Sequence, residues 1–133
     1  MSEENKKIAL AFYQKLLDEL DVETAIKLYG GKDYKQHNPL VEDGEEGVRK
    51  FAAWIRENRP KARAEIKRVF ADGDFVILHV YWSGLFGERG EAVVDIFRLE
   101  DGKVVEHWDV IQDEATRDQS KSELPMFGES FPH

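Results

Sequence analysis

The spacing of the apolar residues changes once along the chain, near residue 62, and this change limits the folds that the sequence can adopt. Up to that point apolar residues recur every three or four positions, which predicts helices. Beyond it they alternate with polar residues, which predicts strands. The helical stretches are 5–20, 22–29 after the capping residue Asp21, and 48–58. Helices followed by strands are typical of an α+β domain.

Two Asp-Gly turns divide the second part of the chain into two hairpins. One turn is centred on Asp72 and Gly73 and the other on Asp101 and Gly102, and such turns join antiparallel strands. The fold class is therefore α+β, with three N-terminal helices packed on a strongly curved antiparallel sheet of about four strands. A sheet so curved over helices is expected to form a cone with one internal cavity. The strands are expected at residues 64–70, 75–82, 91–99 and 104–112.

Length and charge exclude several classes of protein. The 133 residues fit one domain, 1–133, in which 113–133 is expected to be a C-terminal tail that docks on the body or on a partner subunit. A formal charge of -8 repels phosphate backbones and anionic lipids, so neither nucleic acid nor membrane is an expected partner. The absence of cysteine and a charged start without a long apolar run favour a cytoplasmic location.

The last predicted strand carries polar residues where a core strand has none. In "VVEHWDVIQ", residues 104–112, His107 and Asp109 share one face because strand side chains alternate, and Trp108 points the other way. Asp95 stands in an apolar row of the preceding strand. In strict hairpin register Asp95 shares a face with Trp108, whereas a one-residue bulge in the turn brings it beside His107 and Asp109. The residues alone leave both registers open.

Two further histidines are candidates for a site. His37 lies in the predicted loop 32–44, just before Asn38 and Pro39, and a rigid loop of this kind can aim the ring into the mouth of the cavity. His79 lies within the apolar strand 75–82. It is either a hydrogen-bonded core histidine or a residue that lines the cavity.

The stretches "DYKQHNPLVEDG" and "GERGEAVVDIFRLEDGKVVEHWDVIQ", with the helix-loop-helix before them, resemble the SnoaL-like polyketide cyclase branch of the nuclear-transport-factor-2-like superfamily. The most specific parts are the loop from Gln36 to Pro39 and the run from Asp95 to Asp109. The resemblance covers nearly the whole chain. It implies a cone-shaped, cystatin-like fold with a single apolar cavity and a homodimer formed through the outer sheet face, where Trp108 would be buried. It also favours the bulged register.

Polyketide cyclases of this family close rings by intramolecular aldol condensation without a metal or an organic cofactor. The resemblance implies acid/base chemistry on a small apolar carbonyl compound, with Asp109 as general acid/base. His37, His107 and Asp95 would then orient or polarise the substrate oxygen. No cofactor is expected, and the sequence has no helical His-x-x-x-His pair to suggest a metal site. The expected substrate-binding residues are Trp54, Tyr13, Phe12, Phe51, Trp82 and His79.

Other functions of the same cavity stay open, because a fold does not determine a reaction. One is isomerisation by proton shuttling, as in the related ketosteroid isomerases. Another is epoxide hydrolysis, as in limonene epoxide hydrolases, but this needs an Asp-Arg-Asp cluster and Arg98 falls on the opposite strand face from Asp95. A third is a non-catalytic dimeric domain that holds a small apolar ligand.

Overall fold

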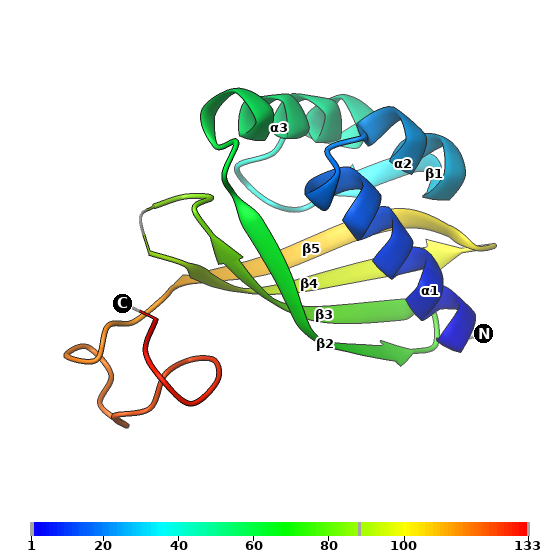
Figure 1. Ribbon diagram of the computed structural model, residues 1–133. Coiled ribbons are helices and arrows are strands. Elements are labelled where there is room, and N and C mark those ends of the chain that lie inside the picture. The colour runs from blue at the N-terminus through cyan, green and yellow to red at the C-terminus, as the bar shows by residue number, and fades with distance from the viewer. Residues whose placement is uncertain (1, 88, 133) are drawn as a thin grey trace.

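The computed structural model describes residues 2–87 and 89–132, and in this part of the chain three α-helices pack against one five-stranded sheet (Figure 1). The predicted α+β class with a curved sheet is confirmed. The helices are α1 (Ser2–Tyr13), which continues as the π-helical stretch η1 (Gln14–Asp18), α2 (Val22–Tyr29) and α3 (Gly44–Asn58). The strands are β1 (Gly30–Gln36), β2 (Arg63–Asp72), β3 (Phe75–Ser83), β4 (Glu91–Glu100) and β5 (Lys103–Asp113).

The first strand, β1, corrects the prediction of a purely antiparallel sheet of about four strands. The strand order is β1-β5-β4-β3-β2, and β1 runs parallel to β5 while the other neighbours are antiparallel. The sequence "GGKDYKQ" was expected to end a helix and enter a loop. It lacks alternating apolar residues because β1 is an edge strand in which only Tyr34 is buried. Apolar periodicity therefore does not reveal this strand.

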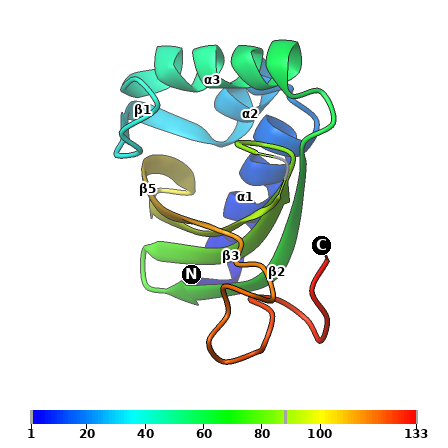
Figure 2. The same cartoon turned by 90° about the vertical axis from the view of Figure 1, so that its left-hand side faces the viewer.

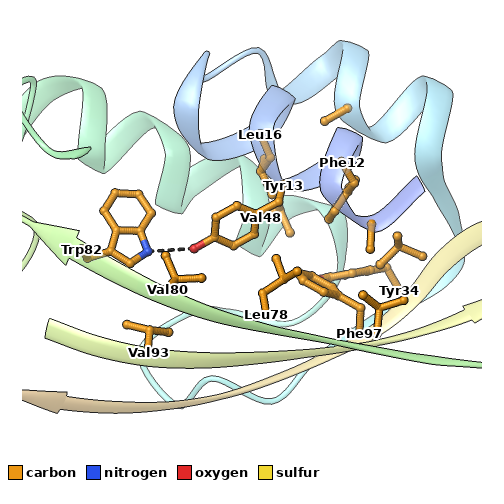
Figure 3. Packing of buried hydrophobic residues seen from close by; sticks show 14 of the residues in the cluster. Phe12, Tyr13, Leu16, Tyr34, Val48, Leu78, Val80, Trp82, Val93 and Phe97 are labelled. Atoms are coloured by element: carbon orange, nitrogen blue, oxygen red, sulfur yellow. Dashed lines mark hydrogen bonds between the residues drawn. The ribbon is translucent and has the colours of Figure 1, made fainter. Parts of the chain in front are cut away.

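The core lies between the helices and the inner face of the sheet. Figure 2 shows the sheet curving around α1, and Figure 3 shows side chains of α1 meeting those of β3 and β4. The Phe12 ring meets Phe97 edge-on, with ring centroids 6.1 Å apart. The Trp82 indole Nε1 donates a hydrogen bond of 2.8 Å to the Tyr13 hydroxyl (Figure 3). A buried N–H thus has a partner within the apolar core.

The β4–β5 hairpin contains the bulge on which the candidate site depends. Leu99 pairs with Val104, but the preceding residue, Arg98, pairs with Glu106, so Val105 is an extra residue in β5. The bulge lies just after the Asp-Gly turn rather than in it. Beyond it, Asp95 lies directly opposite Asp109. The bulged register that the resemblance favoured is therefore the observed one.

Residues 114–132 form turns and irregular backbone after β5 and fold back onto the outer sheet face. The Phe127 ring packs against His79 at 4.6 Å and against Tyr81 at 5.5 Å between centroids. The structure thus places this tail on the body of the same chain. Among the described residues, no helix combines the length and the apolar character needed to cross a membrane.

Candidate active site

A narrow pocket of about 60 Å³ lies between the helices and the inner sheet face. β4 and β5 supply three of its polar side chains, Asp95, His107 and Asp109, and the end of β1 and the loop after it supply Gln36 and Asn38. Carboxylates and an imidazole thus face an apolar wall, where burial disfavours their charged forms. The aromatic residues of the wall are Phe12, Tyr13, Tyr34, Phe51, Trp82, Phe86 and Phe97.

Asp95 and His107 form a buried pair among the polar side chains of the pocket. His107 Nε2 lies 2.8 Å from Asp95 Oδ1, and the two side chains are only 10% and 5% exposed. The second carboxylate oxygen, Asp95 Oδ2, is buried without a hydrogen-bond partner among the described residues. Because an unpaired buried oxygen lowers the stability of the fold, a donor such as the nearby Tyr13 hydroxyl or a group on a bound ligand would be favoured at this position.

The loop after β1 contacts both polar residues of β5. Gln36 Oε1 lies 2.8 Å from His107 Nδ1, so both nitrogens of the imidazole have an oxygen neighbour. Asn38 Nδ2 donates to Asp109 Oδ2 at 2.8 Å. The loop itself is tied to β5, since the His37 backbone N–H donates to the His107 carbonyl at 3.0 Å. The imidazole and the carboxylate are thus held by the same short segment.

Asp109 is the carboxylate whose acidity the pocket changes. Its side chain is 9% exposed, and burial raises the pKa of Asp109 above its ordinary value. The nearby His107 and the hydrogen bond from Asn38 lower that pKa, and the charge of Asp95 raises it further. His107 Nε2 lies 3.9 Å from Asp109 Oδ2. A carboxylate with a raised pKa is a stronger base than an ordinary aspartate.

Tyr13 adds a hydroxyl to the pocket. Burial, followed by the negative charge of Asp95, raises the pKa of Tyr13 well above its ordinary value, although the hydrogen bond from Trp82 lowers it. Tyr13 therefore stays a neutral hydroxyl near neutral pH. Burial likewise raises the pKa of Tyr34, which lies in the same wall.

The comparisons with known proteins agree with this fold. A family model described as the SnoaL-like domain matches residues 9–107. The chain belongs to this family. No curated protein matches the sequence.

Solved structures that resemble this SnoaL-like chain share its fold at low sequence identity. TsrD from Streptomyces laurentii is 20% identical over 84% of this chain and 90% of its own, with a TM-score of 0.70. A candidate polyketide cyclase from Bacillus cereus is 23% identical over 81% of this chain and 74% of its own, with a TM-score of 0.69. An LEH-like epoxide hydrolase from M. tuberculosis is 22% identical over 84% of both chains, with a TM-score of 0.62.

Several of the predicted site residues of this SnoaL-like domain line the pocket. Asp95, His107 and Asp109 are brought together there. Trp54 does not line it but lies beside it, in a second, open hollow of about 360 Å³ that shares Val41, Phe51 and Phe86 with the pocket. The predicted substrate-binding residues within the pocket wall are Phe12, Tyr13, Phe51 and Trp82.

His37 and His79 lie outside the pocket, contrary to the expected positions. The His37 ring is on the outer side of the sheet, where Nε2 lies 2.7 Å from Glu106 Oε2 and the ring stacks on Trp108. Strand geometry explains this, because Gln36 at the end of β1 points inward and its neighbour points outward. His79 lies on the outer face of β3, with Nδ1 2.8 Å from the Arg68 guanidinium and the ring under Phe127.

Gln36 and Asn38 are two polar pocket residues that were not predicted from the sequence. Both belong to the loop that carries the family resemblance, but His37 was the expected residue because the resemblance implies a pocket histidine in this loop and the rigid loop can aim its ring into the cavity. A signal was present. If residues 34–36 are read as a strand, Tyr34 and Gln36 share a face and His37 does not. The segment has no apolar alternation to identify it as a strand, so this signal could not be recognised by periodicity.

Asp95, His107 and Asp109 also have the side-chain types that bind metal ions, and their ligand atoms lie within 4.8 Å of one another. Two ligand atoms about 2.0 Å from a tetrahedral zinc ion are roughly 3.3 Å apart. His107 Nε2 and Asp95 Oδ1 are 2.8 Å apart, which is a hydrogen-bond distance, and His107 Nδ1 is engaged by Gln36. The observed arrangement is that of a hydrogen-bonded cluster.

Proposed function

We propose that this chain is a small enzyme that transfers protons on an apolar carbonyl compound, using Asp109 as the general acid/base and no organic cofactor. The observation that carries the proposal is a buried carboxylate of raised pKa beside a fixed imidazole in an apolar pocket. Such a base suits the removal of a proton next to a carbonyl group. An intramolecular aldol cyclisation, which begins with this step, is the reaction that we favour.

In this proposal the remaining polar residues act on the substrate oxygen. Removal of a proton by Asp109 moves negative charge onto the carbonyl oxygen, and donors placed at that oxygen stabilise the transition state. The neutral Tyr13 hydroxyl is such a donor in the pocket wall. The His107 and Asp95 pair, whose shared proton lies between Nε2 and Oδ1, orients the substrate oxygen. His37 has no direct part, because its ring lies on the outer sheet face.

The apolar walls suggest the kind of substrate. The narrow pocket accepts a small head group, and the adjoining hollow at Trp54 offers ring surface for the rest of a flat or cyclic molecule. The rings of Phe51 and Trp54 are nearly parallel, at 7° and 6.2 Å between centroids. A small apolar ketone with one or two rings is therefore a suitable first probe.

Epoxide hydrolysis is less well supported, although Asp95 lies opposite Asp109 and two carboxylates are available. The arginine that this chemistry needs is elsewhere. Arg98 donates to Glu106 and Glu100 on the outer side of the hairpin. Isomerisation uses the same proton abstraction and is distinguished from cyclisation by its product.

We also propose that two copies pair through the outer sheet face. That face carries apolar side chains in partial exposure, among them Val110 at 65% and Phe75 at 40%. Stable interfaces commonly bury about 800 Å² on each partner, and apolar strand faces serve this purpose. A mass of twice 15.4 kDa in light scattering would support the dimer, and a monomer at micromolar concentration would refute it.

Exchange of α-protons in heavy water tests the proposed function without knowledge of the natural substrate. Proton NMR follows loss of the α-proton signals of 1-indanone, acetophenone and cyclohexanone with and without the protein. We expect the wild type to accelerate exchange and Asp109→Asn to lose about 10²–10⁴-fold of that rate. Circular dichroism checks that the variant is folded. Equal rates for the wild type and the variant, or no acceleration with any of these ketones, would contradict the proposal.

A further inference from the structure

We propose that Gln36 and Asn38 are positioning residues, which decide where the protons of the site reside. Gln36 keeps His107 protonated at Nδ1, and Asn38 binds one oxygen of Asp109 and leaves the other to the substrate. This inference deepens the proposed function and rests on it for its catalytic consequence. The proton positions themselves can be tested without any substrate.

The orientation of the Gln36 amide follows from a backbone group. The Asn38 backbone N–H can only donate, and it lies 3.0 Å from Gln36 Oε1. The amide atom on that side must therefore be the oxygen. The same oxygen lies 2.8 Å from His107 Nδ1, and two acceptors do not form a hydrogen bond. His107 Nδ1 must accordingly carry the proton.

The orientation of the Asn38 amide is determined in the same way. The Leu40 backbone N–H donates to Asn38 Oδ1 at 2.8 Å, so the opposite side of the amide is the nitrogen. That nitrogen donates to Asp109 Oδ2 at 2.8 Å. Asn38 is 6% exposed, and its carbonyl accepts from the Val41 N–H, which closes the turn. Two backbone N–H groups of one loop thus orient both side-chain amides.

These orientations determine how many protons the inner cluster holds. With Nδ1 protonated, the 2.8 Å contact between His107 Nε2 and Asp95 Oδ1 contains one proton. Whichever of the two atoms holds it, the pair has no net charge. The charge of the cluster then depends on Asp109 alone, and Asn38 occupies only its Oδ2. Asp109 Oδ1 is therefore the oxygen that is positioned to take a proton from a substrate.

The test replaces Gln36 by leucine, which has a similar size and no acceptor. Without an acceptor at Nδ1, a proton on Nε2, next to the Asp95 carboxylate, is more stable than one on Nδ1. In this variant the Nδ1 proton should therefore pass to solvent and leave a neutral His107 protonated at Nε2 alone. We expect ¹⁵N NMR near neutral pH to show a protonated Nδ1 in the wild type and an unprotonated Nδ1 in Gln36→Leu. The conservative variant Gln36→Glu keeps an acceptor at this position and should retain the wild-type Nδ1 signal.

The matched control is His37→Ala, which changes the neighbouring residue of the same loop but faces the outer side of the sheet. It should leave the Nδ1 signal of His107 unchanged. In the ketone exchange assay, Gln36→Leu should lower kcat about 10–100-fold with little change in KM, as is usual for residues that orient a reacting group through another residue. Gln36→Glu should recover part of that loss.

The outcomes separate the two proposals. An unprotonated Nδ1 in the wild type, or the same Nδ1 signal in the wild type and in Gln36→Leu, would overturn the positioning role whether or not the protein is active. A change of the Nδ1 signal in Gln36→Leu, with retention of the signal in Gln36→Glu and His37→Ala, would establish the positioning role of Gln36. If the signals behave in this way while the wild type exchanges no ketone, the proposed function fails and the proton assignment stands.

Discussion

Two imidazole–carboxylate contacts of nearly equal length lie on opposite faces of β5. His37 Nε2 is 2.7 Å from Glu106 on the outer face, and His107 Nε2 is 2.8 Å from Asp95 on the inner face. The side chains of the outer pair are 43% and 14% exposed, whereas those of the inner pair are 10% and 5% exposed. Glu106 and His107 are consecutive residues. Local chemistry is thus almost the same, and only the surroundings differ.

The surroundings also determine the acidity of the carboxylates on the two faces of β5, as Glu106 on the outer face and Asp109 on the inner face show. A hydrogen bond from Arg98, followed by one from His37, lowers the pKa of Glu106, so this group is a weak base and is ionised at all moderate pH values. Burial raises the pKa of Asp109 on the inner face. Solvent and a basic partner stabilise the outer charge, and the apolar pocket destabilises the inner one. A short contact between acid and imidazole is therefore no indication of catalysis by itself.

Breaking the inner pair should have the largest effect on stability. Asp95→Ala leaves His107 Nε2 buried without its carboxylate, and loss of one partner of a buried pair costs about 3–5 kcal/mol. Urea unfolding followed by circular dichroism measures the loss. The comparison is Glu106→Ala, in which the carboxylate on the outer face is removed. Equal losses in the two variants would show that burial does not distinguish the pairs.

A second inner contact tests the same point with uncharged groups. Tyr13→Phe removes the acceptor of the buried Trp82 N–H, and a buried donor without a partner costs about 1–3 kcal/mol. The matched control is Tyr29→Phe, at a partly exposed tyrosine, which should change the free energy of unfolding by less than about 0.5 kcal/mol. A Tyr13→Phe variant as stable as the wild type would contradict the expected contribution of the Trp82 bond.

Breaking the outer pair should have a small effect. His37→Ala removes a half-exposed partner of Glu106, and contacts of this kind contribute about 0–1 kcal/mol. Urea unfolding at low and high salt measures the change, which should shrink as salt screens the charges. A loss above about 2 kcal/mol would place the outer pair in the same class as the inner one.

The smallest expected effect concerns the pH dependence of Asp109→Asn. The folded-state pKa of Asp109 is raised, so its ionisation opposes folding, and the wild type should lose stability relative to the variant as pH rises through that pKa. Below the ordinary aspartate pKa of about 3.9 the difference should be constant. At neutral pH the variant should be as stable as the wild type or more stable. Unfolding midpoints from pH 3 to 8 measure the difference in stability. A wild type that becomes more stable relative to the variant as pH rises would contradict the prediction.

Much of the fold was predictable from local patterns. The helical spacing of Ile8, Phe12 and Leu16, and the alternation in β3 and β4, depend only on residues near one another in the sequence. The same alternation placed His107 and Asp109 on one face. Prediction failed for β1, whose pairing with β5 joins residues such as Gln36 and His107 across more than half of the chain. No local periodicity reports such a pairing.

By itself, the sequence determined which residue types were available, the order of the elements and the faces of each hairpin, because strand and helix periods are properties of the local backbone. Only the tertiary structure decided which histidine serves the pocket. The Val105 bulge places Asp95 opposite Asp109, and the pairing of β1 with β5 turns Gln36 and Asn38 inward and His37 outward. Both features depend on contacts between residues far apart in the sequence, because Tyr34 and the other pocket residues must be buried together. Burial is a property of the whole fold and not of a local segment.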